Sequence, residues 1–141
     1  MYSKILVPTD GSTISTVAAR HANELARAFE AEIFVLCVQE TVGVTESISN
    51  SAERYPNDEE AQDSIDLVTE RLDEDIDTTE FTMVGGSVAK TILEYAHEQD
   101  IDLVVMGTTG RTGAERFLIG SVAEKIVRQS KVPVTTVRET S

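Results

Sequence analysis

The sequence predicts an α/β protein built around one parallel sheet, with helices on both faces of the sheet. Short apolar runs alternate with amphipathic segments along the 141 residues, and the runs are apolar on both faces. Strands of that kind are typical of parallel sheets covered by helices on both sides. No linker or internal repeat divides the chain, so we expect a single domain over residues 1–141.

The first half of the chain predicts two strands and a long helix between them. The strands are the apolar runs at residues 4–8 and 32–38, the first of which ends at a proline. Apolar steps of three and four predict the helix, with Ser12 or Thr13 as its cap. Its expected inward stripe consists of Ile14, Val17, Ala18, His21, Ala22, Leu25, Ala26 and Phe29. Residues 40–60 are polar and predict a long loop.

The second half predicts three more strands, at residues 79–84, 101–106 and 133–137. Three helices alternate with these strands, and their predicted starts are Asn57 or Asp58, Ser87, and about Gly120. Each crossover between parallel strands is expected to be right-handed. Ligands of such sheets bind beyond the carboxyl ends of strands where the strand order reverses, which directs attention to the loops after residues 8 and 106.

The net charge of the chain argues against some classes of partner. Twenty-five acidic and twelve basic residues give a net charge of −13, which repels nucleic acid and anionic membranes, so we expect neither as a partner. The apolar runs are also too short to span a membrane. Two explanations for the acidity stay open: an acidic face for a cation or basic partner, and a surface adapted to high salt. The even scatter of acids and the presence of only four lysines favour the salt-adapted surface.

A single cysteine and the start of the chain bear on its location. Cys37 lies in an apolar run and has no second cysteine to pair with, so we expect a small buried side chain in a reducing compartment. The first residues lead directly into the first strand and lack the pattern of a signal peptide. Both observations predict a cytoplasmic protein.

A glycine-rich segment after Met106 is the strongest functional signal. Gly107, Gly110 and Gly113 follow the fourth predicted strand, and such glycines let the backbone approach a ligand closely. Gly120 and Ser121 then open a helix, whose first N–H groups and partial positive charge suit a phosphate.

Two arginines, Arg111 and Arg116, add positive charge to this segment, where Glu115 is the one acid between residues 107 and 121. The segment therefore predicts a phosphate site. The alternative is a flexible loop whose arginines pair with neighbouring acids.

Asp10, at the end of the first strand, suggests a second part of the same site. A carboxylate would repel phosphate, but it can accept hydrogen bonds from the hydroxyls of a ribose. It can also cap the following helix, and both roles are compatible.

Three familiar motifs do not fit the chain. A Walker A loop needs a lysine directly after its last glycine, where this chain has Ser121. A Rossmann fingerprint needs a Gly-x-Gly-x-x-Gly run after the first strand, where this chain has Asp10, Gly11 and Ser12. A two-component receiver would need paired acids after the first strand.

The pattern Gly107-x2-Gly110-x9-Gly120-Ser121 resembles the ATP-binding signature of the universal stress protein family. The resemblance covers the whole chain, because the opening residues 5–12, the Gly85 turn and the closing residues 132–138 also match. It implies a five-stranded parallel sheet with strand order 3-2-1-4-5, and ATP held beside the first and fourth strands.

The resemblance also implies a set of site residues. Near the adenosine these are Pro8, Thr9, Asp10, Val38 and Met106, and near the ribose and phosphates they are Gly107, Gly110, Gly120, Ser121 and Val122, with Arg111 adding charge. Ala123 departs from the pattern, since many ATP-binding members carry a hydroxyl side chain there. Mg²⁺ would be held mainly by the phosphates and water.

No catalytic set is evident in the sequence. His21, His97 and Lys90 have no partners at a useful spacing, and we expect structural or solvated roles for them. The sequence therefore predicts an ATP-binding stress-response regulatory protein that responds to nucleotide occupancy and is sensed by an unknown protein partner. The alternatives are a slow ATPase or phosphoryl transferase, and a dimeric interaction protein without nucleotide. The uncharged strand at residues 133–137 would form an exposed sheet edge, and the family resemblance implies a homodimer through it.

Overall fold

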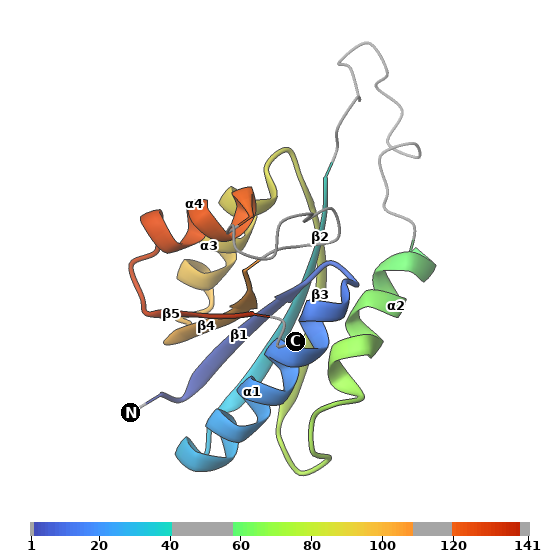
Figure 1. Ribbon diagram of the computed structural model, residues 1–141, viewed down its shortest axis with the longest axis vertical. Coiled ribbons are helices and arrows are strands. Elements are labelled where there is room, and N and C mark those ends of the chain that lie inside the picture. Colours follow the sequence, from blue (N-terminus) through green and yellow to red (C-terminus); the bar gives the residue numbers. More distant parts are fainter. Residues whose placement is uncertain (1, 41–57, 109–119, 139–141) are drawn as a thin grey trace.

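The computed structural model describes residues 2–40, 58–108 and 120–138 (Figure 1). The strands are β1 (Lys4–Thr9), β2 (Glu32–Glu40), β3 (Thr78–Gly85), β4 (Leu103–Gly107) and β5 (Val134–Val137). All neighbouring strands are parallel, and their order is β3-β2-β1-β4-β5. The predicted fold class and strand order are therefore confirmed.

Four helices connect these strands. They are α1 (Thr13–Phe29), α2 (Asp58–Thr69), α3 (Val88–Glu98) and α4 (Ser121–Gln129). Most ends of helices and strands agree with the sequence prediction to within two residues. Ser12 and Ser87 occupy the cap positions of α1 and α3 as expected. The Ser87 side chain accepts a cap hydrogen bond, whereas the Ser12 side chain makes none, and Asn57 lies outside the described residues.

The sheet separates two hydrophobic cores. Figure 1 shows α1 and α2 on one side of the sheet and α3 and α4 on the other. Side chains alternate across a strand, so Ile5 and Val7 of β1 pack with α1 and α2, while Leu6 packs with α3 and α4. The alternation explains why the central strands read as continuous apolar runs.

The inward face of α1 differs from the predicted stripe. His21 is exposed, and Phe29 is 38% exposed, packing edge-on against Tyr2. The buried face of α1 instead includes the small residue Ala19 and the polar residue Asn23.

Asn23 accounts for part of this rotation. Its side chain accepts a hydrogen bond from the backbone N–H of Asp73 at 2.8 Å and donates one to the Asp73 carboxylate at 3.2 Å. A buried polar side chain is stable when it is paired in this way, and an apolar periodicity cannot reveal such a pairing.

β3 departs from the expectation that every strand is covered on both faces. All eight of its residues are exposed or half-buried, because the strand lies at one edge of the sheet. β5 forms the opposite edge, which agrees with the predicted position of the last strand.

Asp102 fixes the amino end of β1. One of its carboxylate oxygens accepts hydrogen bonds at 2.9 Å from the backbone N–H groups of Ser3 and Lys4 and from the Ser3 hydroxyl. These bonds, led by the one from the Ser3 N–H, lower the pKa of the Asp102 carboxyl. The polar contacts at this end therefore join β1 to the segment that enters β4.

Candidate functional site

The turn after β1 is held by its own side chains. The buried Thr9 hydroxyl donates to the carbonyl of Ser64 on α2 at 3.2 Å and accepts from the Gly11 N–H at 3.2 Å. Gly11 has a φ of 84°, a left-handed conformation that favours glycine. Thr9 thus joins the end of β1 to α2, and the turn directs the next residue outward.

Asp10 is exposed at this turn. Its carboxylate accepts a hydrogen bond from the N–H of Ser12, the cap residue of α1, at 2.9 Å. The side chain therefore braces the entry into α1, in line with the capping role considered for it.

A cavity of about 320 Å³ opens beside Asp10. The residues that line it are Asp10, Cys37, Val38, Gln39, Glu40, Glu60 and Ser64. The cavity brings together Asp10 and Val38, two predicted site residues that come from β1 and β2. It also includes two α2 residues, Glu60 and Ser64, that sequence reasoning missed.

The polar lining of this cavity determines which ligand groups it suits. Three carboxylates, those of Asp10, Glu40 and Glu60, repel an anion, so this cavity suits a neutral group with hydrogen-bond donors better than it suits a phosphate.

The end of β4 lies next to the start of α4. The N–H of Gly120 donates a hydrogen bond to the carbonyl of Thr108, and the N–H of Thr108 donates to the carbonyl of Val137 at 2.9 Å. These bonds join two points of the chain that lie on either side of residues 109–119. Gly107, Gly120 and Ser121 are consequently close together at the carboxyl end of the sheet.

Gly107 is required by packing against α1. A Cβ atom at this position would lie 2.6 Å from two side-chain carbons of Ile14. Since Ile14 is buried, any larger residue at position 107 would displace the first turn of α1 or the end of β4.

The cap residue at the start of α4 cannot supply a side-chain hydrogen bond. It is Gly120, and the first helical residue, Ser121, is exposed. A helix N-terminus of this kind carries N–H groups and a partial positive charge that favour an anion.

Comparison with known proteins identifies the family. The family model described as "Universal stress protein family" matches residues 1–138 of the chain. The chain belongs to the universal stress protein family. Universal stress protein MJ0531 of Methanocaldococcus jannaschii is 37% identical over 142 residues, which cover 99% of this chain and 84% of that relative.

Solved structures agree with this assignment. Universal stress protein UspA from Lactobacillus plantarum superposes with a TM-score of 0.81 at 26% identity, over 97% of this chain and 98% of that one. A universal stress protein in complex with cAMP has a TM-score of 0.68 at 26% identity, with 97% of each chain covered.

The predicted site residues differ in burial and position. Pro8 and Met106 are buried, Met106 in the core beneath α3 and α4, so their side chains form part of the protein interior. Val122 is half-buried in the first turn of α4. Gly110 and Arg111 lie outside the described residues. The remaining predicted residues surround the carboxyl ends of β1, β2 and β4.

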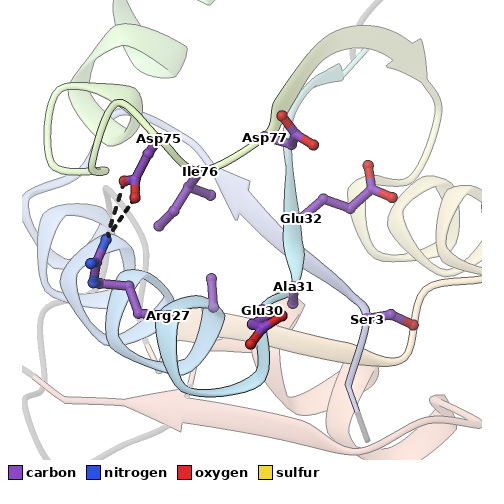
Figure 2. A pocket seen from close by; sticks show the side chains of 9 residues that line it. Ser3, Arg27, Glu30, Ala31, Glu32, Asp75, Ile76 and Asp77 are labelled. Carbon is purple, nitrogen blue, oxygen red and sulfur yellow. Dashed lines mark hydrogen bonds and ion pairs between the residues drawn. The ribbon is translucent and has the colours of Figure 1, made fainter.

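A second cavity, of about 520 Å³, lies at the opposite end of the sheet (Figure 2). Arg27 pairs there with Asp75 at 3.1 Å and with Asp73 at 2.9 Å, and the Asp75 charge is the main reason that the pKa of Arg27 is raised. The cavity is also lined by the acidic residues Glu30, Glu32 and Asp77. This end of the universal stress protein fold is therefore a poor place for an anionic ligand.

In the part of the chain that the structure describes, no helix is long and apolar enough to cross a membrane. Residues 2–40, 58–108 and 120–138 contain no group of three or more His, Cys, Asp or Glu side chains that could hold a metal ion.

Proposed function

We propose that this universal stress protein binds an adenine nucleotide, ATP with Mg²⁺, at the carboxyl ends of β1, β2 and β4. The observation that carries the proposal is that two unlike regions lie at the carboxyl ends of the neighbouring strands β1 and β4: a cavity with carboxylates beside Asp10, and a helix start whose cap residue, Gly120, has no side chain. A nucleotide combines the same two chemistries, a neutral nucleoside and an anionic phosphate chain.

The nucleoside would occupy the cavity beside Asp10 and Val38. Its ribose hydroxyls would donate hydrogen bonds to the Asp10 carboxylate, which the turn already holds outward. Backbone groups at the end of β2, near Val38, would contact the adenine.

The phosphates would lie at the start of α4. The N–H groups of the first turn and the Ser121 hydroxyl would donate to them, with Gly110 and Arg111 completing this part of the site. Mg²⁺ would be held mainly by phosphate oxygens and water, as is usual for this ion. The universal stress protein solved in complex with cAMP supports an adenine nucleotide as the ligand class.

We further propose that the protein acts through occupancy of this site, within the cytoplasm and as a homodimer. The dimer would form by pairing of β5, residues 133–137, from two copies. Within the described residues β5 pairs with β4 on one side, and its other side would pair with the second copy. A protein partner would then distinguish the occupied from the empty dimer. The single cysteine, Cys37, is buried, which is compatible with a reducing compartment.

A negative charge introduced at the start of α4 tests whether the phosphates bind there. Ser121→Glu places a carboxylate where the phosphates are expected, and acids at a helix start do not disturb the helix. Repulsion of like charges should weaken Mg-ATP binding roughly hundredfold, measured by titration calorimetry.

Ser121→Gln is the matched control, because it has nearly the same shape without the charge. It should lose much less affinity than Ser121→Glu. Equal affinity of wild type and Ser121→Glu, with both proteins folded, would refute the placement of the phosphates.

A further inference from the structure

The outer edge of β3 is a long strand edge that is separate from the nucleotide site. β3 runs over eight residues, Thr78–Gly85, and pairs with β2 along its whole length. Among residues 2–40, 58–108 and 120–138, no strand pairs with its other side. Such an edge offers a row of backbone donors and acceptors to an added strand.

The pairing with β2 shows which backbone groups face outward. The carbonyl of Asp77 accepts from the N–H of Ile33 on β2 at 2.9 Å, so Asp77 faces inward. Successive residues of a regular strand alternate, and the register between β2 and β3 is unbroken. The N–H and C=O groups of Glu80, Thr82 and Val84 therefore point away from the sheet.

An exposed aromatic side chain accompanies this edge on the α3 side. Phe81 is 48% exposed and is one of the four large apolar side chains found exposed in the described residues. Phe81 stacks on Tyr95 of α3, with 5.7 Å between the ring centroids, which holds the aromatic ring in place beside the edge. The opposite edge strand, β5, has four residues, and they are half-buried or buried.

Acidic side chains lie on the α2 side of β3. Glu80 belongs to β3 itself, and the sequences of α2 and β3 contain no lysine or arginine. Gln62 of α2 donates to the carboxylates of both Asp66, at 2.9 Å, and Glu80, at 3.4 Å, so two of these acids lie close together beside the strand.

We infer that the outer edge of β3 is a docking site for an extended basic segment of another protein, which joins the sheet as a sixth strand. The segment carries lysine or arginine on the face toward α2, opposite Glu80, and apolar side chains on the face toward α3, beside Phe81. Alternation of basic and apolar residues meets both faces at once. A second copy of this chain is the less suitable occupant, because it brings its own Glu80 and a charge of −13.

Peptide binding to the full-length protein tests this site. The probe is a peptide as long as β3 with alternating lysine and valine, and its control has the same composition arranged as one lysine block and one valine block. Amide chemical shifts of the ¹⁵N-labelled protein report the position of binding. The alternating peptide should shift amides of residues 78–85, and the block peptide should bind more weakly.

Two substitutions at Thr82 distinguish peptide binding by strand pairing from peptide binding by charge attraction alone. Thr82→Pro removes an outward N–H, and proline is tolerated at an edge strand, so affinity should fall about tenfold or more. Thr82→Val keeps the N–H and should bind like wild type. Glu80→Gln should weaken binding roughly two- to fivefold at low salt.

The proposal is overturned if the alternating peptide shifts no amides of β3, or if it binds there no better than the block peptide. It is also overturned if Thr82→Pro, folded by circular dichroism, binds as well as Thr82→Val. Self-association of the protein through β3 would overturn it in favour of a second copy as the occupant. Because the wild-type shift map does not depend on any variant, a misfolded Thr82→Pro protein leaves that test intact.

Discussion

On the α3/α4 side of the sheet, the β3–α3 and β4–α4 connections differ in length and in how the following helix is capped. Between β3 and α3 only Gly86 and Ser87 intervene, and the Ser87 hydroxyl accepts a hydrogen bond from the Lys90 N–H at 3.3 Å. Between β4 and α4 the connection comprises residues 108–120, and its last residue, Gly120, gives α4 no side-chain cap.

Each connection follows a strand that ends in a glycine required by packing. A Cβ atom at Gly85 would overlap the hydroxyl of Thr91, and one at Gly107 would overlap Ile14. The strand-end glycines therefore serve helix packing, whereas the difference in capping distinguishes the two helix starts. The short β3–α3 connection supplies a side-chain cap for α3. The β4–α4 connection, which we assign to the nucleotide, leaves the first N–H groups of α4 to bind an anion.

The largest effect is expected from removing the packing glycine. Gly107→Ala should lower the free energy of unfolding by about 2 kcal/mol, because its Cβ overlaps the buried Ile14 side chain. Urea denaturation measures this. Gly86→Ala, at an exposed position of the other connection, is the control and should change stability by less than about 0.5 kcal/mol.

A double substitution then isolates the contact. Ile14→Ala removes the carbons that the new Cβ would meet, so Gly107→Ala should cost much less in that background. An undiminished cost would show that the glycine is needed for some other reason.

A smaller effect is expected from the caps themselves. Ser87→Ala removes the hydroxyl that accepts from Lys90 and should lower stability by about 1 kcal/mol. Ser121→Ala, which alters the start of α4 without removing a cap, should leave the stability of the nucleotide-free protein nearly unchanged. Comparison of the two thermal unfolding midpoints tests the difference, and equal losses would contradict it.

A small gain in stability is expected from adding a cap to α4. Gly120 has φ and ψ of −70° and 163°, which a serine adopts readily. Gly120→Ser should stabilise the nucleotide-free protein by a few tenths of a kcal/mol (roughly 0.3) and weaken Mg-ATP binding, because its hydroxyl then competes for the same N–H groups. If both affinity and stability rise, the helix start is not where the phosphates bind.

Much of this fold could be predicted from the sequence because its signals are local. The apolar runs, the Ser12 and Ser87 caps and the glycine after each strand each depend on a few neighbouring residues. The face of α1 could not be predicted in full, because the pairing of Asn23 with Asp73 joins residues 50 positions apart. The predicted inward position of His21 is wrong, since its side chain is exposed.

The candidate site shows the same division. Asp10, Val38, Gly107 and the start of α4 could be predicted from the strand ends and the glycine spacing. The contribution of α2 could not, since Ser64 reaches the site through a hydrogen bond from Thr9, 55 positions away. One weak signal existed: Ser64 precedes Ile65 on the buried face of α2, where a small polar side chain is unusual.

The most direct test of the account is the nucleotide content of the purified protein. The protein is purified in high-salt buffer and denatured, and the released small molecules are identified by chromatography and mass. The account predicts an adenine nucleotide at close to one per chain, or stoichiometric uptake of added Mg-ATP if the protein is isolated empty. A protein that is empty and also fails to bind Mg-ATP would contradict the nucleotide site and leave a dimeric interaction protein as the better description.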